Sequence, residues 1–197
     1  MGKNHPSVDP YVASRVRALE SLLLEKGLLA SDAVDRVIQR YADDTGPMIG
    51  ARAVARAWTD PGYRRLLLEE SKAALATFGL DYGLLVVVEN TPVVHNLVVC
   101  TLCSCYPWDV LGLPPTWYKS PPYRSRAVRE PRLLLREEFG LDVPQSREIR
   151  IWDSSAELRY MVLPERPPGT EALDESELTS LITRDALIGV AEVKAPA

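Results

Sequence analysis

Residues 93–105 read VVHNLVVCTLCSC, a valine-rich run that leads directly into a hexapeptide with three cysteines. The run 93–99 predicts a buried strand, and a similar run at 84–88 predicts another, with turn residues at 90–92 between them. Every cysteine of the chain lies within residues 100–105, and an odd number spaced so closely is no disulfide framework. The sequence therefore predicts a strand that ends in a loop of free thiols.

The sequence before residue 84 has the apolar spacing of short helices. Asp9 is a favourable cap for a helix that begins at Pro10, and Gly27 is placed to end it. One face of this helix is apolar and consists of Val12, Val16, Leu19, Leu22 and Leu23. Such stripes suit either a small helical bundle or an arm that buries them on another chain, and we favour an extended helical arm over residues 1–83.

Strands and helices mix in residues 84–197, which we interpret as a second domain. Segments 147–152 and 157–163 alternate in polarity and are predicted to form a hairpin around residues 153–155. Two helices are also predicted, over residues 131–139 and from Asp174 onward. The pattern as a whole indicates the α+β class, with an N-terminal helical arm followed by a mixed domain.

The composition excludes several classes of protein. The chain has 197 residues, a formal net charge of −4, 46% hydrophobic residues and 25% charged residues, which is typical of a globular protein. A mildly acidic chain is a poor nucleic-acid binder, and no apolar run approaches the roughly 20 residues that span a bilayer. Because no apolar signal-peptide core follows the first residues, we expect a cytoplasmic protein without a nucleic-acid or membrane partner.

The cysteines by themselves suit more than one chemistry. A Cys-x-x-Cys pair can be a redox dithiol or half of a zinc site. Structural zinc takes four Cys or His ligands, and the chain offers only His5 and His95 besides the cysteines. His95 lies on a predicted strand, where a packed or hydrogen-bonded core histidine is the commoner interpretation. A redox dithiol has no need of a third cysteine, so both roles are the weaker alternatives.

The tripeptide Cys103-Ser104-Cys105 also permits a different coordination. Its two thiolates and the backbone amide nitrogens of Ser104 and Cys105 can form a square plane around a metal ion. Cys100 can then cap the plane and leave a sixth position open. Amide nitrogens bind only when deprotonated, which requires a strongly Lewis-acidic trivalent ion such as low-spin Co(III) or Fe(III).

This loop and its surroundings closely resemble the α subunit of nitrile hydratase. The resemblance is strongest over residues 99–108 and continues with Leu-Gly-Leu-Pro-Pro at 111–115. Similar motifs extend it to nearly the whole chain, at residues 17–20, 57–61, 88–91, 123–126, 129–132, 137–140, 152–155, 157–159 and 163–164. The resemblance implies a layered α-β-β-α metal-binding catalytic domain at 84–197 and an arm at 1–83 that wraps a partner subunit.

The resemblance also assigns the metal centre. Cobalt-type members have Thr after the first cysteine and iron-type members have Ser, so Thr101 favours one noncorrin Co(III) per chain over iron. Cys100 is expected to be an unmodified thiolate, Cys103 a sulfinate and Cys105 a sulfenate. The amides of Ser104 and Cys105 complete the ligand set.

The reaction implied by the resemblance is hydration of a small-molecule nitrile to an amide, with the metal as Lewis acid. Cys105 and Cys103 are the expected catalytic residues, and the nucleophile is either the Cys105 sulfenate oxygen or a metal-bound hydroxide. Trp108, Trp117 and Tyr118 are expected to line the substrate pocket, with a place in the core or at an interface as the alternative for each.

Three further residues are expected around the metal centre: Thr101, Asp153 and Glu157. For the two acids the alternative is a turn residue and a surface charge. A basic cluster alternates with glutamates, which favours ion pairs on a helix and with a partner over an anion site. Its members are Arg124, Arg126, Arg129, Arg132 and Arg136.

The resemblance further implies a β-type partner, either one chain or split into two, and an activator protein for cobalt insertion. The competing interpretations are the γ subunit of a thiocyanate hydrolase, a metal-carrying α-type chain and a zinc-stabilised module. Product analysis distinguishes the first of these from a nitrile hydratase, and elemental analysis distinguishes the other two.

Overall fold

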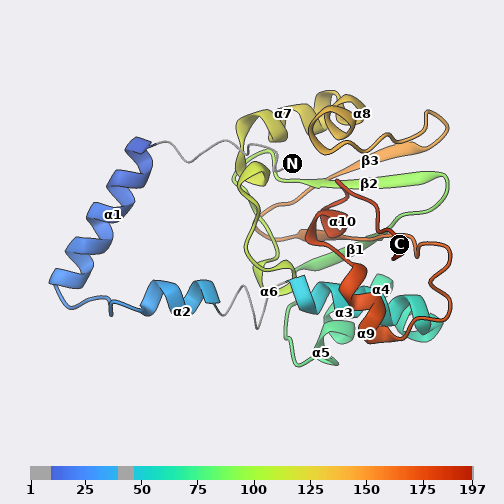
Figure 1. Ribbon diagram of the computed structural model, residues 1–197, viewed down its shortest axis with the longest axis horizontal. Helices are drawn as coiled ribbons and strands as arrows, with labels where there is room; N and C mark the ends of the chain where they lie inside the picture. The colour runs from blue at the N-terminus through green and yellow to red at the C-terminus, as the bar shows by residue number, and fades with distance from the viewer. Residues whose placement is uncertain (1–9, 40–46, 197) are drawn as a thin grey trace.

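The computed structural model describes residues 10–39 and 47–196, and it has the α+β architecture that the sequence predicts (Figure 1). In chain order its elements are α1 (Pro10–Glu25), α2 (Ala33–Gln39), α3 (Pro47–Thr59), α4 (Pro61–Glu69), α5 (Ser71–Ala76), β1 (Leu85–Glu89), β2 (Val94–Val99), α6 (Trp108–Leu111), the 3₁₀ helix η2 (Thr116–Lys119), α7 (Pro121–Arg129), α8 (Pro131–Leu134), the π-helical turn η3 (Leu135–Phe139), β3 (Glu148–Asp153), β4 (Arg159–Leu163), α9 (Glu175–Leu181) and α10 (Arg184–Ile188).

The strands form two parallel pairs. β1 pairs with β4 from Leu85↔Arg159 to Glu89↔Leu163, and β2 pairs with β3 from Val94↔Glu148 to Val99↔Asp153. The predicted hairpin of the last two strands is therefore wrong. A tight turn does follow β3, closed by Ser155 N–H donating to the Leu158 carbonyl, but the chain then crosses to the other pair. Alternating polarity identifies a strand but does not determine the strand with which it pairs. Here β3 pairs with the valine-rich β2, and β4 pairs with the valine-rich β1.

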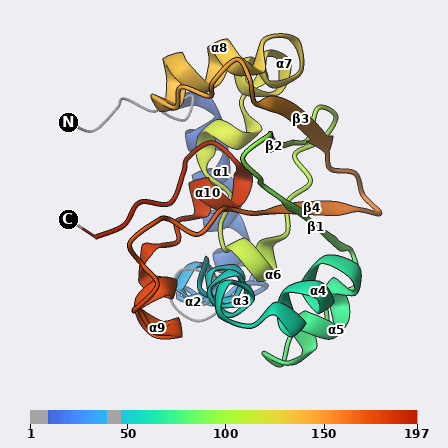
Figure 2. The ribbon, with the colours of Figure 1, turned by 90° about the vertical axis from the view of Figure 1, so that its right-hand side faces the viewer.

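Helices cover the two strand pairs on opposite sides, which gives the layered order helix–strand–strand–helix (Figures 1 and 2). α7 packs on β2, whereas α4 and α5 pack on β1. α10 contacts both β2 and β4 and so lies between the pairs. Residues of α3, α4 and α5 share one buried core with the strands, with Val54, Leu67 and Leu75 all fully inaccessible to solvent.

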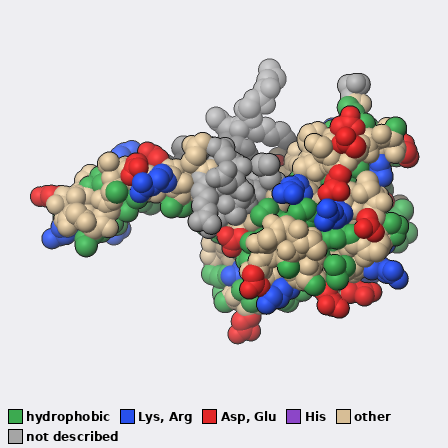
Figure 3. All heavy atoms as spheres, turned by 90° about the horizontal axis from the view of Figure 1, so that it is seen from below, with side chains coloured by type: hydrophobic (Ala, Val, Ile, Leu, Met, Phe, Trp, Pro, Cys, Tyr) green, Lys and Arg blue, Asp and Glu red, His purple; other side chains and the backbone are tan. Residues whose placement is uncertain are grey.

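The N-terminal helices α1 and α2 project away from this body as an arm (Figures 1 and 3). α1 has no buried residue, and the apolar face predicted for it is open to solvent, with Val16 57% and Leu19 61% exposed. The predicted cap Asp9 lies outside the described residues. The helices α3–α5 precede residue 84 but belong to the same core as the strands that follow it. The division of the chain into two domains at residue 84 therefore stays a prediction.

Local signals located the C-terminal helices well. The helix predicted over 131–139 is present as α8 and η3, and Gly140 ends it in the left-handed conformation with φ 69°. α9 begins after Asp174, which forms a capping box with Glu177. In the described part of the chain, no helix is both long and apolar enough to cross a bilayer.

The close packing of α10 on β2 depends on Gly189. This residue has φ +90°, and a Cβ atom built on it would lie 2.0 Å from the Asn96 carbonyl oxygen. The carbonyl oxygen of Gly189 lies 2.8 Å from Nε2 of His95, which is fully buried. His95 is thus the hydrogen-bonded core histidine favoured by the sequence. Burial is the main reason why the pKa of its imidazole is lowered.

We expect the substitution Gly189→Ala to destabilise the fold by roughly 3 kcal/mol or more, since the methyl group must displace the β2 backbone and the left-handed conformation adds strain. The matched control is Gly169→Ala, because Gly169 also has a positive φ, of +82°, but no atom within 4 Å of the added Cβ. That control carries only the backbone strain, about 1 kcal/mol. Thermal unfolding followed by circular dichroism measures both, and equal losses would contradict the packing argument.

Candidate metal centre

The loop that follows β2 brings all three cysteines together. Their sulfur atoms lie within 4.8 Å of one another, with 2.9 Å between Cys103 Sγ and Cys105 Sγ and 3.6 Å between Cys100 Sγ and Cys103 Sγ. Cys100 is fully buried, Cys105 is half-buried and Cys103 is exposed. All three are free thiols, so the cluster has a buried base and an open side.

The backbone of the loop turns inward toward these sulfurs. The N–H groups of Cys103 and Ser104 donate to Cys100 Sγ at 3.3 and 3.1 Å. Among the described non-glycine residues, Ser104 alone has a positive φ, at 83°. Such a conformation costs of order 1 kcal/mol or more and persists only where the surrounding contacts impose it. The donor set is therefore three sulfurs with backbone amides beside them.

This donor set fits the trivalent ion predicted from the sequence better than zinc. Structural zinc takes a fourth Cys or His ligand, and the described residues offer no other cysteine. His95 is buried, with Nε2 against the Gly189 carbonyl oxygen. Sulfur ligands combined with amide nitrogens suit a softer and more strongly Lewis-acidic ion.

The thiols at the two ends of the loop differ in acidity. Burial raises the pKa of the Cys100 thiol, but the N–H groups of Cys103 and Cys105 stabilise its thiolate and hold the pKa below its usual value. Burial and the Cys103 sulfur raise the pKa of Cys105 to about 11, although the nearby Arg159 opposes the shift. A strongly charged cation at the cluster would favour the thiolate of Cys105, the sulfur whose pKa the surrounding protein raises.

Two contacts anchor the loop at its ends. The Asp153 carboxylate accepts from Thr101 N–H at 2.9 Å and from Thr101 Oγ1 at 2.6 Å. The parallel register Val99↔Asp153 puts these residues at the same edge of the strand pair. At the other end, the Tyr118 hydroxyl donates to the Cys105 carbonyl oxygen at 3.0 Å. Burial raises the pKa of Tyr118, so this hydroxyl keeps its proton and its role as donor.

The structure separates the three predicted pocket aromatics. Trp117 and Tyr118 are buried in a cluster of rings in edge and tilted contacts. Trp108 is 37% exposed, and Lys119 Nζ lies 5.3 Å from its ring centroid. The remaining predicted residue, Glu157, is exposed in the turn between β3 and β4. Of the two acids, Asp153 is therefore the one that contacts the cysteine loop.

Two arginines near the loop were not predicted as part of the site. Arg124 Nη1 lies 3.5 Å from the Leu102 carbonyl oxygen, and Arg159 is close enough to Cys105 for its charge to oppose the rise in the Cys105 pKa. Arg159 reaches the loop because β4 lies beside β1, a long-range pairing for which the sequence has no local signal. The predicted ion pairs of the basic cluster are present at Arg126, which bonds to Glu130, Glu137 and Glu138.

Comparison with known proteins agrees with this geometry. The family described as "Nitrile hydratase, alpha chain" matches residues 10–191. The cobalt-containing nitrile hydratase subunit alpha of Pseudonocardia thermophila is 51% identical, over 98% of this chain and 96% of its own. The structure of a double mutant of the Fe-type nitrile hydratase from Comamonas testosteroni Ni1 is 45% identical with a TM-score of 0.85, over 96% and 94% of the two chains.

A more distant relative is the thiocyanate hydrolase subunit gamma of Thiobacillus thioparus, 43% identical over 90% of this chain and 78% of its own. The family match covers the arm, the strand pairs and the cysteine loop together. The chain belongs to the nitrile hydratase alpha chain family.

Proposed function

We propose that this chain is the metal-holding subunit of a cobalt-type nitrile hydratase, which adds water to R–C≡N to give R–C(=O)NH₂. The observation that supports it most directly is the loop at 100–105, where three free thiols lie within 4.8 Å of one another and the Cys103 and Ser104 amides point at Cys100 Sγ. A relative that is 51% identical over nearly the whole chain is named as cobalt-containing.

The proposed ligands are the sulfurs of Cys100, Cys103 and Cys105 and the amide nitrogens of Ser104 and Cys105. Cobalt bound there supplies Lewis acidity that draws electrons from the nitrile carbon and makes it open to attack. Thr101 is the feature that favours cobalt, as Co(III), over the iron of the Fe-type neighbour. Loading of the ion by an activator protein is part of the same proposal.

The proposal gives Cys103 and Cys105 catalytic roles as a sulfinate and a sulfenate, with Cys100 unmodified. Both residues are on the open side of the cluster, so their sulfur oxygens would face the substrate. The Cys105 oxygen either attacks the nitrile carbon or accepts a hydrogen bond from the attacking water and orients it. If the Cys105 oxygen attacks, it forms an S–O–C link, which a water molecule then hydrolyses to restore the sulfenate. In both cases one water is consumed: one oxygen ends in the amide carbonyl and the two protons of the water end on the amide nitrogen.

The residues around the loop have distinct proposed roles. Trp108, partly exposed, would form an apolar wall for the nitrile side chain, with Trp117 and Tyr118 packed behind it. Asp153 and Thr101 would hold the loop in position. Glu157, whose side chain is exposed, would face the partner subunit.

A β-type partner completes the proposed site. Cys103 is exposed and Leu102 is 88% exposed, so one side of the loop is open to solvent. Sulfur oxyanions in a closed pocket need charge-assisted donors, and an added subunit can supply them while excluding water. We further propose that the first part of residues 1–83, α1 and α2, acts as an arm that grips this subunit, and that residues 84–197, with α3–α5 packed on their core, form the catalytic domain. The unburied apolar face of α1 supports the first part.

The proposed function is tested with the cobalt-loaded complex of this chain and its cognate β-type chain. We expect about one cobalt per chain by elemental analysis and rapid formation of amide from nitrile, whereas the chain alone has negligible activity because its site is open. Release of carbonyl sulfide and ammonia from thiocyanate, without amide formation from nitriles, would assign the thiocyanate hydrolase activity instead. Stoichiometric zinc in fully active protein would overturn the cobalt assignment.

Peptide mapping by mass spectrometry tests the proposed cysteine oxidation, which needs an oxidant such as dissolved oxygen. Metal-loaded protein is expected to have two extra oxygen atoms on Cys103 and one on Cys105, with Cys100 unchanged. Protein prepared without cobalt should lack these oxygens, because oxidation is expected to follow metal binding; the pKa of the Cys105 thiol, raised to about 11, also keeps that thiol protonated without the metal. Full activity with three unmodified thiols would rule out the catalytic roles.

The substitution Asp153→Asn tests the anchoring of the loop. An amide can accept only one of the two Thr101 hydrogen bonds well, and it presents a donor to the other, so we expect cobalt affinity to fall roughly 10- to 100-fold. The measurement is the cobalt retained per chain after dialysis against a chelator. Asp142→Asn is the matched control, since Asp142 is exposed, and retention should equal that of the wild type.

A further inference from the structure

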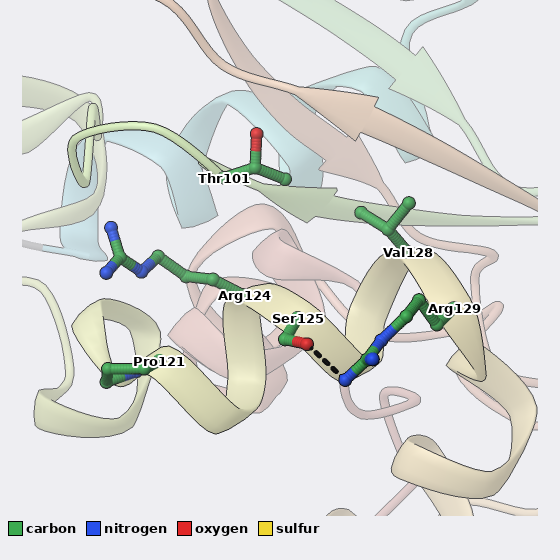
Figure 4. A pocket seen from close by; sticks show the side chains of 6 residues that line it. All are labelled: Thr101, Pro121, Arg124, Ser125, Val128 and Arg129. Carbon is green, nitrogen blue, oxygen red and sulfur yellow. Dashed lines mark hydrogen bonds between the residues drawn. The ribbon is translucent and has the colours of Figure 1, made fainter.

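A groove lies directly beside the cysteine loop, between its first residues and helix α7 (Figure 4). It has a volume of about 400 Å³ and is lined by Thr101, Pro121, Arg124, Ser125, Val128 and Arg129. The groove belongs to the same face as the loop, because Thr101 forms part of its wall. It is separate from the sulfur cluster and has no role in the chemistry described above.

Two positive charges line this groove, and no carboxylate of residues 10–39 or 47–196 pairs with either of them. Arg124 bonds to the Leu102 carbonyl oxygen, and its buried Nε has no hydrogen-bond partner among the described residues. Arg129 donates to the Ser125 hydroxyl. The contrast with Arg126 on the same helix is clear, since that arginine bonds to three glutamates. Within the described ranges, ion pairs thus neutralise Arg126 and leave the two groove arginines uncompensated.

The surface between and beside these charges is apolar. Val128 is 52% exposed, and Leu102 on the adjoining loop is 88% exposed. In Figure 4 both arginine side chains extend toward the Pro121 end of α7: the guanidinium group of Arg129 ends beside Ser125, and that of Arg124 lies farther along, beyond Ser125. The two guanidinium groups have different partners, the Leu102 carbonyl oxygen and the Ser125 hydroxyl, so they are offset along the helix. An extended segment with more than one acidic residue, and an apolar residue over Val128, fits the charges and the surface together.

We propose that this groove binds an acidic, extended segment of the β-type partner and so fixes the partner over the cysteine loop. The inference rests on the proposed function, which requires a subunit on this open face. It adds the groove as a specific contact and names Arg124 and Arg129 as the residues that recognise the partner through its carboxylates. Burial of the apolar surface supplies part of the affinity, and the two arginines fix the position of the acidic segment along the groove.

The test measures binding of the purified cognate β-type chain to the full-length protein by biolayer interferometry, at low and at high salt. Arg124→Gln and Arg129→Gln should each raise Kd about tenfold, and the double variant about 100-fold with a weaker salt dependence. Arg150→Gln is the matched control, because Arg150 pairs with Glu148 on its own strand, and its Kd should not change. Circular dichroism checks that every variant is folded.

Hydroxyl-radical footprinting of the wild-type complex provides a measurement that does not depend on variants. Val128 should become protected together with Leu102 when the partner binds. A Val128 that stays reactive, or a double variant that binds as tightly as the wild type, would overturn the inference. A third outcome would also overturn it: inorganic phosphate stabilises the wild-type chain but not the double variant, and both bind the partner with the same affinity. The groove would then be a site for a free anion. If instead the wild-type complex forms but yields no amide, it is the proposed function that fails.

Discussion

The parallel pairing of β2 with β3 is the constraint on which the metal centre depends. The register places Val99 opposite Asp153, so the cysteine loop and the carboxylate that holds it leave the strands at the same edge. Thr101 then bonds to both oxygens of that carboxylate, through its backbone and its hydroxyl. An antiparallel pairing would put Asp153 at the far end of β2 and leave the loop without its first anchor.

The second strand pair and the helices act on the same loop from other directions. β4 begins at Arg159, and its pairing with β1 places a guanidinium near Cys105. The ring cluster around Trp117 holds Tyr118 so that its hydroxyl reaches the Cys105 carbonyl. The loop is therefore fixed by contacts from β3, β4 and η2, elements far apart in the sequence, although its three thiols come from one hexapeptide. The local sequence supplies the thiols, and the tertiary structure sets their orientation.

This division explains how much could be predicted from the sequence. The cluster of three thiols, the α8 region with Gly140 and the capping box of Asp174 depend on residues close together in the chain, so their spacing predicts them. The predicted hairpin of β3 and β4 failed because strand partners are chosen over long distances. Arg159 was overlooked for the same reason. The burial of Trp117 and Tyr118, compared with the exposure of Trp108, depends on the packing of η2, which aromatic composition alone does not reveal.

The left-handed backbone at Ser104 has a consequence for the order of events when metal enters. The loop is already closed around its thiols, with the Cys103 and Ser104 amides directed at Cys100 Sγ. The conformational entropy of closing it is therefore lost during folding of the chain and not during capture of the ion. A floppy peptide with the same ligands would have to search for this geometry at each encounter. In the folded protein the loop is preorganised, so the binding of an ion there would depend mainly on the loss of protons from its thiols and amides.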